Sequence, residues 1–221
     1  GWSNTGTYSW NIISAASQTG FSSGNFAVNL TNFGIASANR TGTWTFTNPS
    51  GGNITLTYAA ATPDYIWSGA SGNWSTGFTP TAPTTDKNLV FTGSGGTATN
   101  DIASGTLSSI NFITFNSTAG AYTLNATTGA AGVAGGTALT VKGDIINNSA
   151  NATGQTISMD LAIGTSSTGI INTAAGNITL SGNLSGTGNL TKEGNRTLTL
   201  SSANKSLSGS VTINNGTVSV S

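Results

Sequence analysis

The fold class that the sequence predicts is all-β: a parallel β-helix, or solenoid, with an N-terminal antiparallel β unit rich in aromatic residues. Short segments that alternate apolar and polar residues fill the chain, whereas stretches rich in Ala, Leu, Glu and Lys, which favour helices, are absent. Only 5% of the residues are charged but 36% are hydrophobic, which is enough for a core and too many for a disordered polar chain. In the second half similar segments recur at a fixed interval, as in solenoids.

Residues 1–61 are expected to form the antiparallel unit. Segments 43–47 and 53–58 alternate with period two and flank a stretch of Asn, Pro, Ser and Gly, which is typical of a β-hairpin. The aromatic and aliphatic residues of the two segments would share one face of this hairpin. Further strands are expected at residues 8–13 and 25–30.

Residues 62–87 are interpreted as a junction or cap, because three of the four prolines lie there together with two tryptophans. Residues 88–221 are predicted to form the solenoid, with rungs of about 20 residues. The rungs are inferred from apolar–polar–apolar triplets, which begin at Leu139, Ile157, Ile178, Leu198 and Val218. A second series with nearly the same spacing consists of Ile170, Leu190 and Val211. The alternative for this part is an antiparallel sandwich with regularly spaced strands.

Residues 186–221 carry a longer pattern of spaced glycines, apolar residues and single polar residues. Its positions are Gly186, Gly188, Leu190, Lys192, Gly194, Thr197, Leu198, Leu200, Asn204, Gly209, Thr212, Gly216 and Val220. The pattern resembles the autotransporter-associated β-strand repeat, although Arg196 and Ser202 stand where that family has glycine. Residues 67–91 also look like the opening of a repeat unit in such proteins. The resemblance implies a parallel β-helix in an extracellular or outer-surface protein of a Gram-negative bacterium.

The composition excludes several kinds of partner and structural device. The formal net charge is zero, which provides no attraction for nucleic acid or an anionic membrane surface. Cysteine is absent, so the chain forms no disulfides, and no apolar run approaches the roughly 20 residues of a membrane span. Because the chain starts with Gly1 and shows no signal peptide, we interpret it as a mature or excised segment.

Catalytic chemistry is not expected. The chain has no His and no Cys, which excludes the common catalytic triads, thiol nucleophiles and typical zinc sites. We therefore expect no catalytic residue and no required cofactor. A carbohydrate-active β-helix enzyme that works through clustered carboxylates is kept as a further alternative.

Asp144 and Asp160 are the carboxylates to which this alternative points. Each precedes an aliphatic residue at a similar place in successive rungs, so stacking would bring them about 5 Å apart, with Asn183 in the next rung. Such a ladder of oxygen atoms could bind Ca²⁺. The simpler interpretation is two solvated surface residues. Lys192 and Glu193 are likewise interpreted as a solvated pair in a turn.

Trp67 and Trp74 have two competing interpretations. Exposed tryptophan rings stack on sugars, which would make these residues a glycan-binding patch. Aromatic side chains also close the ends of solenoids, where the core would otherwise be exposed. The sequence favours a role in the cap or core and leaves glycan binding open.

The function predicted from the sequence is a non-enzymatic structural or adhesive segment of a bacterial surface protein, located outside the cell. The chain ends in an alternating strand, and Val211, Ile213, Val218 and Val220 would form an open assembly edge. The expected partners are other copies of the chain, joined end to end into filaments, or glycans of a host or environmental surface. Neither nucleic acid nor membrane insertion of this segment is expected.

Overall fold

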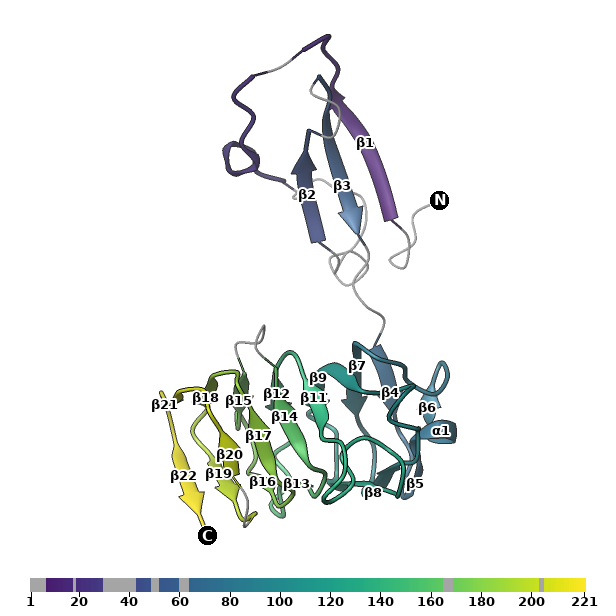
Figure 1. Ribbon diagram of the computed structural model, residues 1–221, viewed down its shortest axis with the longest axis vertical. Helices are drawn as coiled ribbons and strands as arrows, with labels where there is room; N and C mark the ends of the chain where they lie inside the picture. The colour runs from purple at the N-terminus through teal and green to yellow at the C-terminus, as the bar shows by residue number, and fades with distance from the viewer. Residues whose placement is uncertain are drawn as a thin grey trace. The chain divides into compact units, whose positions relative to one another are not determined.

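The computed structural model describes residues 7–17, 19–29, 43–48, 52–59, 64–164, 169–202 and 205–221 (Figure 1). The chain divides into two compact units, Gly1–Pro63 and Asp64–Ser221. Within the described residues the helical elements are one 3₁₀ turn, η1 (Ser23–Asn25), and one short helix, α1 (Trp74–Gly77). The other elements are strands, which confirms the all-β prediction.

The first unit contains a three-stranded antiparallel sheet. Its order is β1 (Thr7–Ile13), β3 (Ile54–Ala59) and β2 (Thr43–Thr47). β2 and β3 form the predicted hairpin, in which Trp44 lies opposite Tyr58. Tyr8 of β1 lies opposite the same tyrosine. Because residues opposite one another share a face, one face of this sheet is aromatic and the other carries Thr, Ser and Asn.

The strand expected at residues 25–30 is not formed in the described part of that segment. Asn25 ends η1, and residues 26–29 have no strand partner there. The ring of Phe26 packs instead on Phe46 of β2, with centroids 5.0 Å apart. Leu30 lies outside the described residues. Packing of Phe26 against the aromatic face thus replaces strand pairing.

The second unit is a β-solenoid in which strands of successive turns pair in parallel (Figure 1). One wall is a seven-stranded sheet, made of β5 (Gly72–Asn73), β8 (Gly95–Asn100), β10 (Ala121–Ala126), β13 (Gln155–Ile157), β16 (Ile178–Leu180), β19 (Thr197–Leu200) and β22 (Thr217–Val220). Each strand of this wall pairs in parallel with the next. The predicted parallel β-helix is confirmed, and the sandwich alternative is wrong.

The other walls belong to a twelve-stranded sheet. It starts with β4 (Asp64–Trp67), β6 (Phe78–Thr79), β7 (Lys87–Phe91) and β9 (Ser109–Phe115). The first half of β9 pairs with β11 and the second half with β12, so the sheet divides into two columns. One column is β11 (Leu139–Val141), β14 (Leu161–Ile163), β17 (Leu184–Gly186) and β20 (Lys205–Leu207). The other is β12 (Ile145–Asn147), β15 (Ile170–Asn172), β18 (Leu190–Glu193) and β21 (Val211–Ile213). Each later turn therefore has three strands.

Burial alternates along these short strands. In β11, β12, β13 and β14 the outer two residues are buried and the middle one is half-buried. This alternation places two side chains of each strand inside and one outside. The inward residues of all three walls form one continuous core cluster, which runs from Trp67 in the first turn to Leu200.

The predicted stacking series is partly right. Three of its residues lie directly over one another in β16, β19 and β22, namely Ile178, Leu198 and Val218. Ile157 is offset by two positions, because it pairs with Leu180. Leu139 belongs to a different wall, where it pairs with Leu161.

The second series shows the same behaviour. Leu190 lies over Val211, but Ile170 is shifted by one position and pairs with Thr191. The loops between walls differ in length from turn to turn. Equal spacing along the chain therefore does not ensure that two residues occupy the same position in successive turns.

Residues 64–87, which the sequence assigns to a junction or cap, form the first turn of the solenoid. β4 pairs in parallel with β7, and β5 pairs in parallel with β8. β6 pairs antiparallel with β4 on its other side. The second compact unit accordingly begins at Asp64, earlier than the boundary at residue 88 that the sequence suggests.

Candidate functional site

Large aromatic rings fill the first turn of the solenoid. Trp67 is 2% exposed and Trp74 is 0% exposed. Both rings meet Phe78 edge-on, with centroids 5.3 and 5.6 Å away. The indole N–H of Trp67 donates to the carbonyls of Gly69 and Ala70, at 3.1 and 3.2 Å. These rings form the core of the first described turn. Their burial agrees with the cap or core role that the sequence favours, and it argues against the alternative of a glycan-binding patch at Trp67 and Trp74.

Asp160 is a buried carboxylate that links two turns. It is 5% exposed and precedes β14. Its Oδ1 accepts a hydrogen bond from Asn183 N at 2.8 Å. Its Oδ2 accepts from Asn183 Nδ2 at 3.0 Å and from Gly135 N at 2.9 Å. Asn183 thus stacks one turn after Asp160, as predicted, and the carboxylate oxygens are bonded to the chain itself.

Asp144 lies at a different corner of the solenoid. It precedes β12, which pairs with β9 and β15, whereas Asp160 precedes β14, which pairs with β11 and β17. Only two strands, β12 and β13, separate the aspartates, but a full turn takes three. The predicted ladder of Asp144 and Asp160, and the joint Ca²⁺ site based on it, is therefore wrong.

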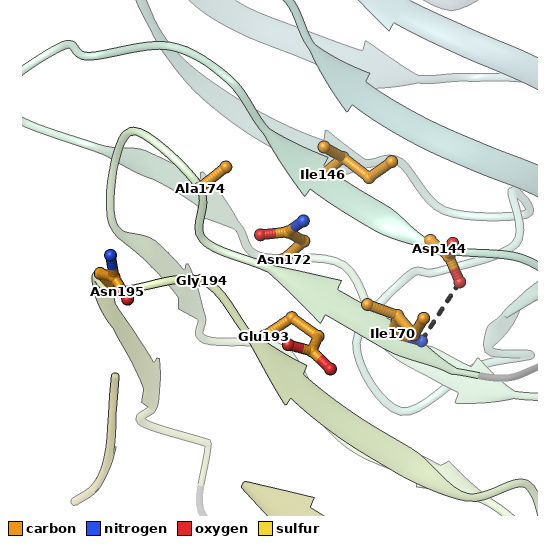
Figure 2. Close-up of a pocket in the computed structure, with 8 residues that line it drawn as sticks. All are labelled: Asp144, Ile146, Ile170, Asn172, Ala174, Glu193, Gly194 and Asn195. Atoms are coloured by element: carbon orange, nitrogen blue, oxygen red, sulfur yellow. Dashed lines mark hydrogen bonds between the residues drawn. The ribbon is translucent and has the colours of Figure 1, made fainter. Parts of the chain in front are cut away.

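Asp144 lines a shallow groove of about 440 Å³ along β12, β15 and β18 (Figure 2). Its Oδ1 accepts a hydrogen bond from Ile170 N at 3.3 Å. The second carboxylate of the groove, that of Glu193, accepts through Oε1 from Asn214 Nδ2 at 2.6 Å. Within the described ranges no group of three or more His, Cys, Asp or Glu could hold a metal ion. Through their hydrogen bonds to Ile170 and Asn214, the carboxylates of Asp144 and Glu193 link neighbouring turns.

The last turn leaves one edge of each wall without a neighbour. β20, β21 and β22 stand at the ends of their columns and pair with β17, β18 and β19 on one side (Figure 1). On the other side no strand of the described part of the chain pairs with them. The predicted assembly residues lie on this edge, with Val211 and Ile213 in β21 and Val218 and Val220 in β22.

Three of these residues occupy inward positions that no later turn covers within the described residues. Val211, Ile213 and Val220 are 55%, 54% and 65% exposed. The residues paired with them one turn earlier are buried, with exposures of 2% for Leu190, 0% for Lys192 and 9% for Leu200. Val218 is half-buried. We call residues 205–221 the C-terminal edge, because their inward side chains form an open apolar surface.

Lys192 lies one turn before this edge and contacts it directly. It is 0% exposed and lies in β18, paired with Ile213 of the last turn. Its Nζ donates to the carbonyls of Glu193, Gly194 and Asn215 at 2.6, 2.7 and 3.0 Å, which uses all three ammonium hydrogens. Burial lowers the pKa of Lys192, and the nearby charge of Glu193 opposes this effect. The expectation of a solvated turn pair is therefore wrong for Lys192.

The described residues include no helix that is long and apolar enough to cross a membrane. No model of a known protein family matches the chain, and neither a curated protein nor a solved structure matches it. The fold and the C-terminal edge are accordingly the basis on which a function is inferred.

Proposed function

We propose that the chain is a non-enzymatic structural or adhesive segment of an extracellular bacterial surface protein, and that it assembles into filaments through its C-terminal edge. The observation that carries the proposal is the exposure of Val211, Ile213 and Val220 at positions that are buried one turn earlier. Apolar side chains beside a row of free backbone N–H and C=O groups form a template for an added strand.

The C-terminal edge lacks the features by which sheet edges normally avoid association. Exposed edge strands usually carry charged side chains or proline, which oppose pairing with another chain. Between residues 206 and 221 there is no Lys, Arg, Asp, Glu or Pro, and Lys205 is the single charged residue of the last turn. β21 and β22 are therefore free of charge and of proline along their whole length.

The location outside the cell is supported by the resemblance of residues 186–221 to the autotransporter-associated β-strand repeat. These residues include β18 to β22, so the resemblance covers the part of the solenoid that carries the open edge. We assign the chain on this ground to the secreted surface proteins of Gram-negative bacteria. A long stack of identical short strands would serve such a protein as a stiff spacer.

No catalytic step is part of the proposal. The sequence has neither His nor Cys, and the carboxylates of Asp144, Asp160 and Glu193 accept hydrogen bonds from other turns. These bonds support a role of the three carboxylates in linking one turn to another.

Assembly that depends on protein concentration tests the proposal. Sedimentation velocity and electron microscopy of the purified chain at rising concentration are expected to show fibres. The double variant Ile213→Lys/Val220→Lys places two positive charges on the edge and is expected to remain monomeric. The double variant Ile66→Lys/Phe112→Lys is the matched control, because Ile66 and Phe112 are 43% and 37% exposed on β4 and β9, away from the edge. A wild-type chain that stays strictly monomeric at high concentration contradicts the proposal.

A further inference from the structure

The exposed large apolar side chains of the described residues gather at two strand edges. Three of them belong to the C-terminal edge defined above. Three more lie in β1, where Trp10, Ile12 and Ile13 are 39%, 50% and 45% exposed. The remaining two, Ile66 and Phe112, lie singly on β4 and β9, as is normal for a protein surface. The molecule thus has a second apolar edge besides the one that carries the proposed function.

β1 is an edge strand with an ordered apolar side. Within the described residues it pairs with β3 alone, and it contains neither a charged residue nor a proline. The ring of Trp10 stacks on Tyr8 and on Trp44, with centroids 5.9 and 6.0 Å away and the planes 18° and 15° apart. These contacts hold the exposed ring in place before any partner arrives, which lowers the entropic cost of binding.

The two edges match in their alternation of side chains. β1 alternates apolar and polar residues from Tyr8 to Asn11, where a bulge before Ile13 shifts its register, and β22 does so from Thr217 to Val220. When β22 pairs with β1, the apolar residues of both strands lie on one face, and the Ser, Thr and Asn residues lie on the other. The apolar face of the three-stranded sheet then continues the inner face of the seven-stranded wall.

The first turn of the solenoid is a less suitable partner for the C-terminal edge. β4 already pairs with β6 on one side and with β7 on the other. The core at this end is filled by Trp67, Trp74 and Phe78, which are all buried. A strand arriving here would find β4 occupied and only the two residues of β5 with a free side, whereas the longer β1 has a free side among the described residues.

We propose that the C-terminal edge of one chain pairs through β22 with β1 of a second copy. This inference rests on the proposed assembly function and names its partner. Neither strand carries charge, so pairing costs no charge repulsion or desolvation of an ion. The two surfaces differ, which makes the contact heterologous rather than two-fold symmetric. Growth is then open-ended and produces filaments rather than closed dimers.

Disulfide trapping tests this pairing directly, because the chain contains no cysteine. Ser9→Cys in β1 and Ser219→Cys in β22 are made in separate chains, and both serines are exposed. After mild oxidation, an equal mixture is expected to give the mixed dimer in excess over both homodimers. In the control mixture Ser68→Cys, an exposed serine beside β4, replaces Ser9→Cys and should give no such excess.

The variant Ile12→Lys provides a second readout. It is expected to raise the concentration at which fibres form by about tenfold or more, because it places a charge in the strand contact. Circular dichroism is compared with wild type to verify the fold, and the trapping result stands without this variant. An excess of the Ser219→Cys homodimer overturns this inference but leaves assembly through the edge intact. Monomers in every mixture, with a wild-type chain that forms no fibres, overturn both proposals.

Discussion

A buried ammonium group is tolerated in a protein core when each of its hydrogens is bonded, and Lys192 meets this condition. Its carbonyl partners come from two turns, since Glu193 and Gly194 belong to its own turn and Asn215 to the next. The side chain thus fastens the corner of the last turn to the turn before it. The sequence held a signal for this position: Leu190 faces inward, and a residue two places along a strand shares its face.

We expect Lys192→Met to destabilise the last turn by about 1–3 kcal/mol, because buried carbonyls lose their donor while the volume is nearly kept. Amide hydrogen exchange over residues 205–221 should become faster. Lys142→Met serves as the control, since Lys142 has a side chain that is 45% exposed, and it should leave exchange in the last turn unchanged. Equal exchange rates in Lys192→Met and wild type would contradict the role of Lys192 in holding the last turn to the turn before it.

The ion pair of Asp86 and Lys142 has a signature in the pH dependence of stability. Lys142 Nζ lies 2.8 Å from Asp86 Oδ2, and Ser109 Oγ donates to Oδ1 at 2.5 Å. The hydrogen bond from Lys142, followed by that from Ser109, lowers the pKa of Asp86. A carboxyl group with a lowered folded pKa stabilises the fold above its unfolded pKa. This stabilisation is lost as the pH falls through the folded value.

Lys142→Met is accordingly expected to lower the free energy of unfolding at pH 7 by about 0.2–1 kcal/mol, the range for exposed pairs. The difference from wild type should shrink as the pH falls through the lowered pKa of Asp86. Urea unfolding at neutral and acidic pH measures both values. Arg196→Gln removes an exposed positive charge elsewhere and controls for net charge. A difference that does not change with pH would show that Asp86 is not the linked group.

At the scale of the element, asparagine side chains at the ends of strands join successive turns. Asn147 ends β12 and is 0% exposed. Its Nδ2 donates to Asn177 O, and its Oδ1 accepts from Ser149 N, both at 2.9 Å. Asn100, at the end of β8, is equally buried and bonds to two backbone groups in the same way. The abundance of asparagine in the chain therefore has a structural use at corners, where the backbone leaves the sheet ladder.

The first turn depends on its aromatic core. Trp74 packs against Phe78 and Phe91, and its indole N–H has no hydrogen-bond partner among the described residues. We expect Trp74→Ala to cost about 3–5 kcal/mol and Trp74→Phe clearly less, because phenylalanine buries no unbonded N–H. Urea unfolding of the two variants measures the costs. Phe112→Ala is the control, since its ring is 37% exposed, and a cost equal to that of Trp74→Ala would contradict the core role.

At the scale of the whole molecule, the solenoid unit is unequal at its two ends. The first turn is closed by β6, α1 and buried rings, whereas the last turn exposes inward valine and isoleucine side chains. The two ends of a stack of parallel turns differ, because each inner turn pairs with the turn before it and the turn after it, whereas the first and last turns pair on different sides only. This inequality is the reason that the proposed contacts between copies are head to tail.

The limits of prediction from the sequence are visible in particular residues. Alternation predicted the hairpin of β2 and β3, and the interval of about 20 residues between similar triplets predicted the stack of Leu198 on Ile178. The predicted stacking of Asp144 on Asp160 was wrong, because the number of residues between them does not show how many walls the chain passes through. For Trp67 and Trp74 the sequence favoured a cap or core role but left glycan binding open, because the exposure of a tryptophan depends on neighbours that lie far away in the chain.

The alternation within strands and the period of about 20 residues can be read along the chain, and they predicted a β-solenoid, its aromatic first unit and the apolar strands near its C-terminal end. The parallel strand pairing of the structure excluded the antiparallel sandwich, which the sequence had left open. The assignment of each strand to a wall depends on loop lengths, and the exposure of each side chain depends on neighbours from other turns. Those contacts join residues far apart in the chain. For this reason only the folded structure shows three features. They are the closed first turn, the hydrogen bonds of Lys192 to the last turn, and the exposed edge at Val211, Ile213 and Val220.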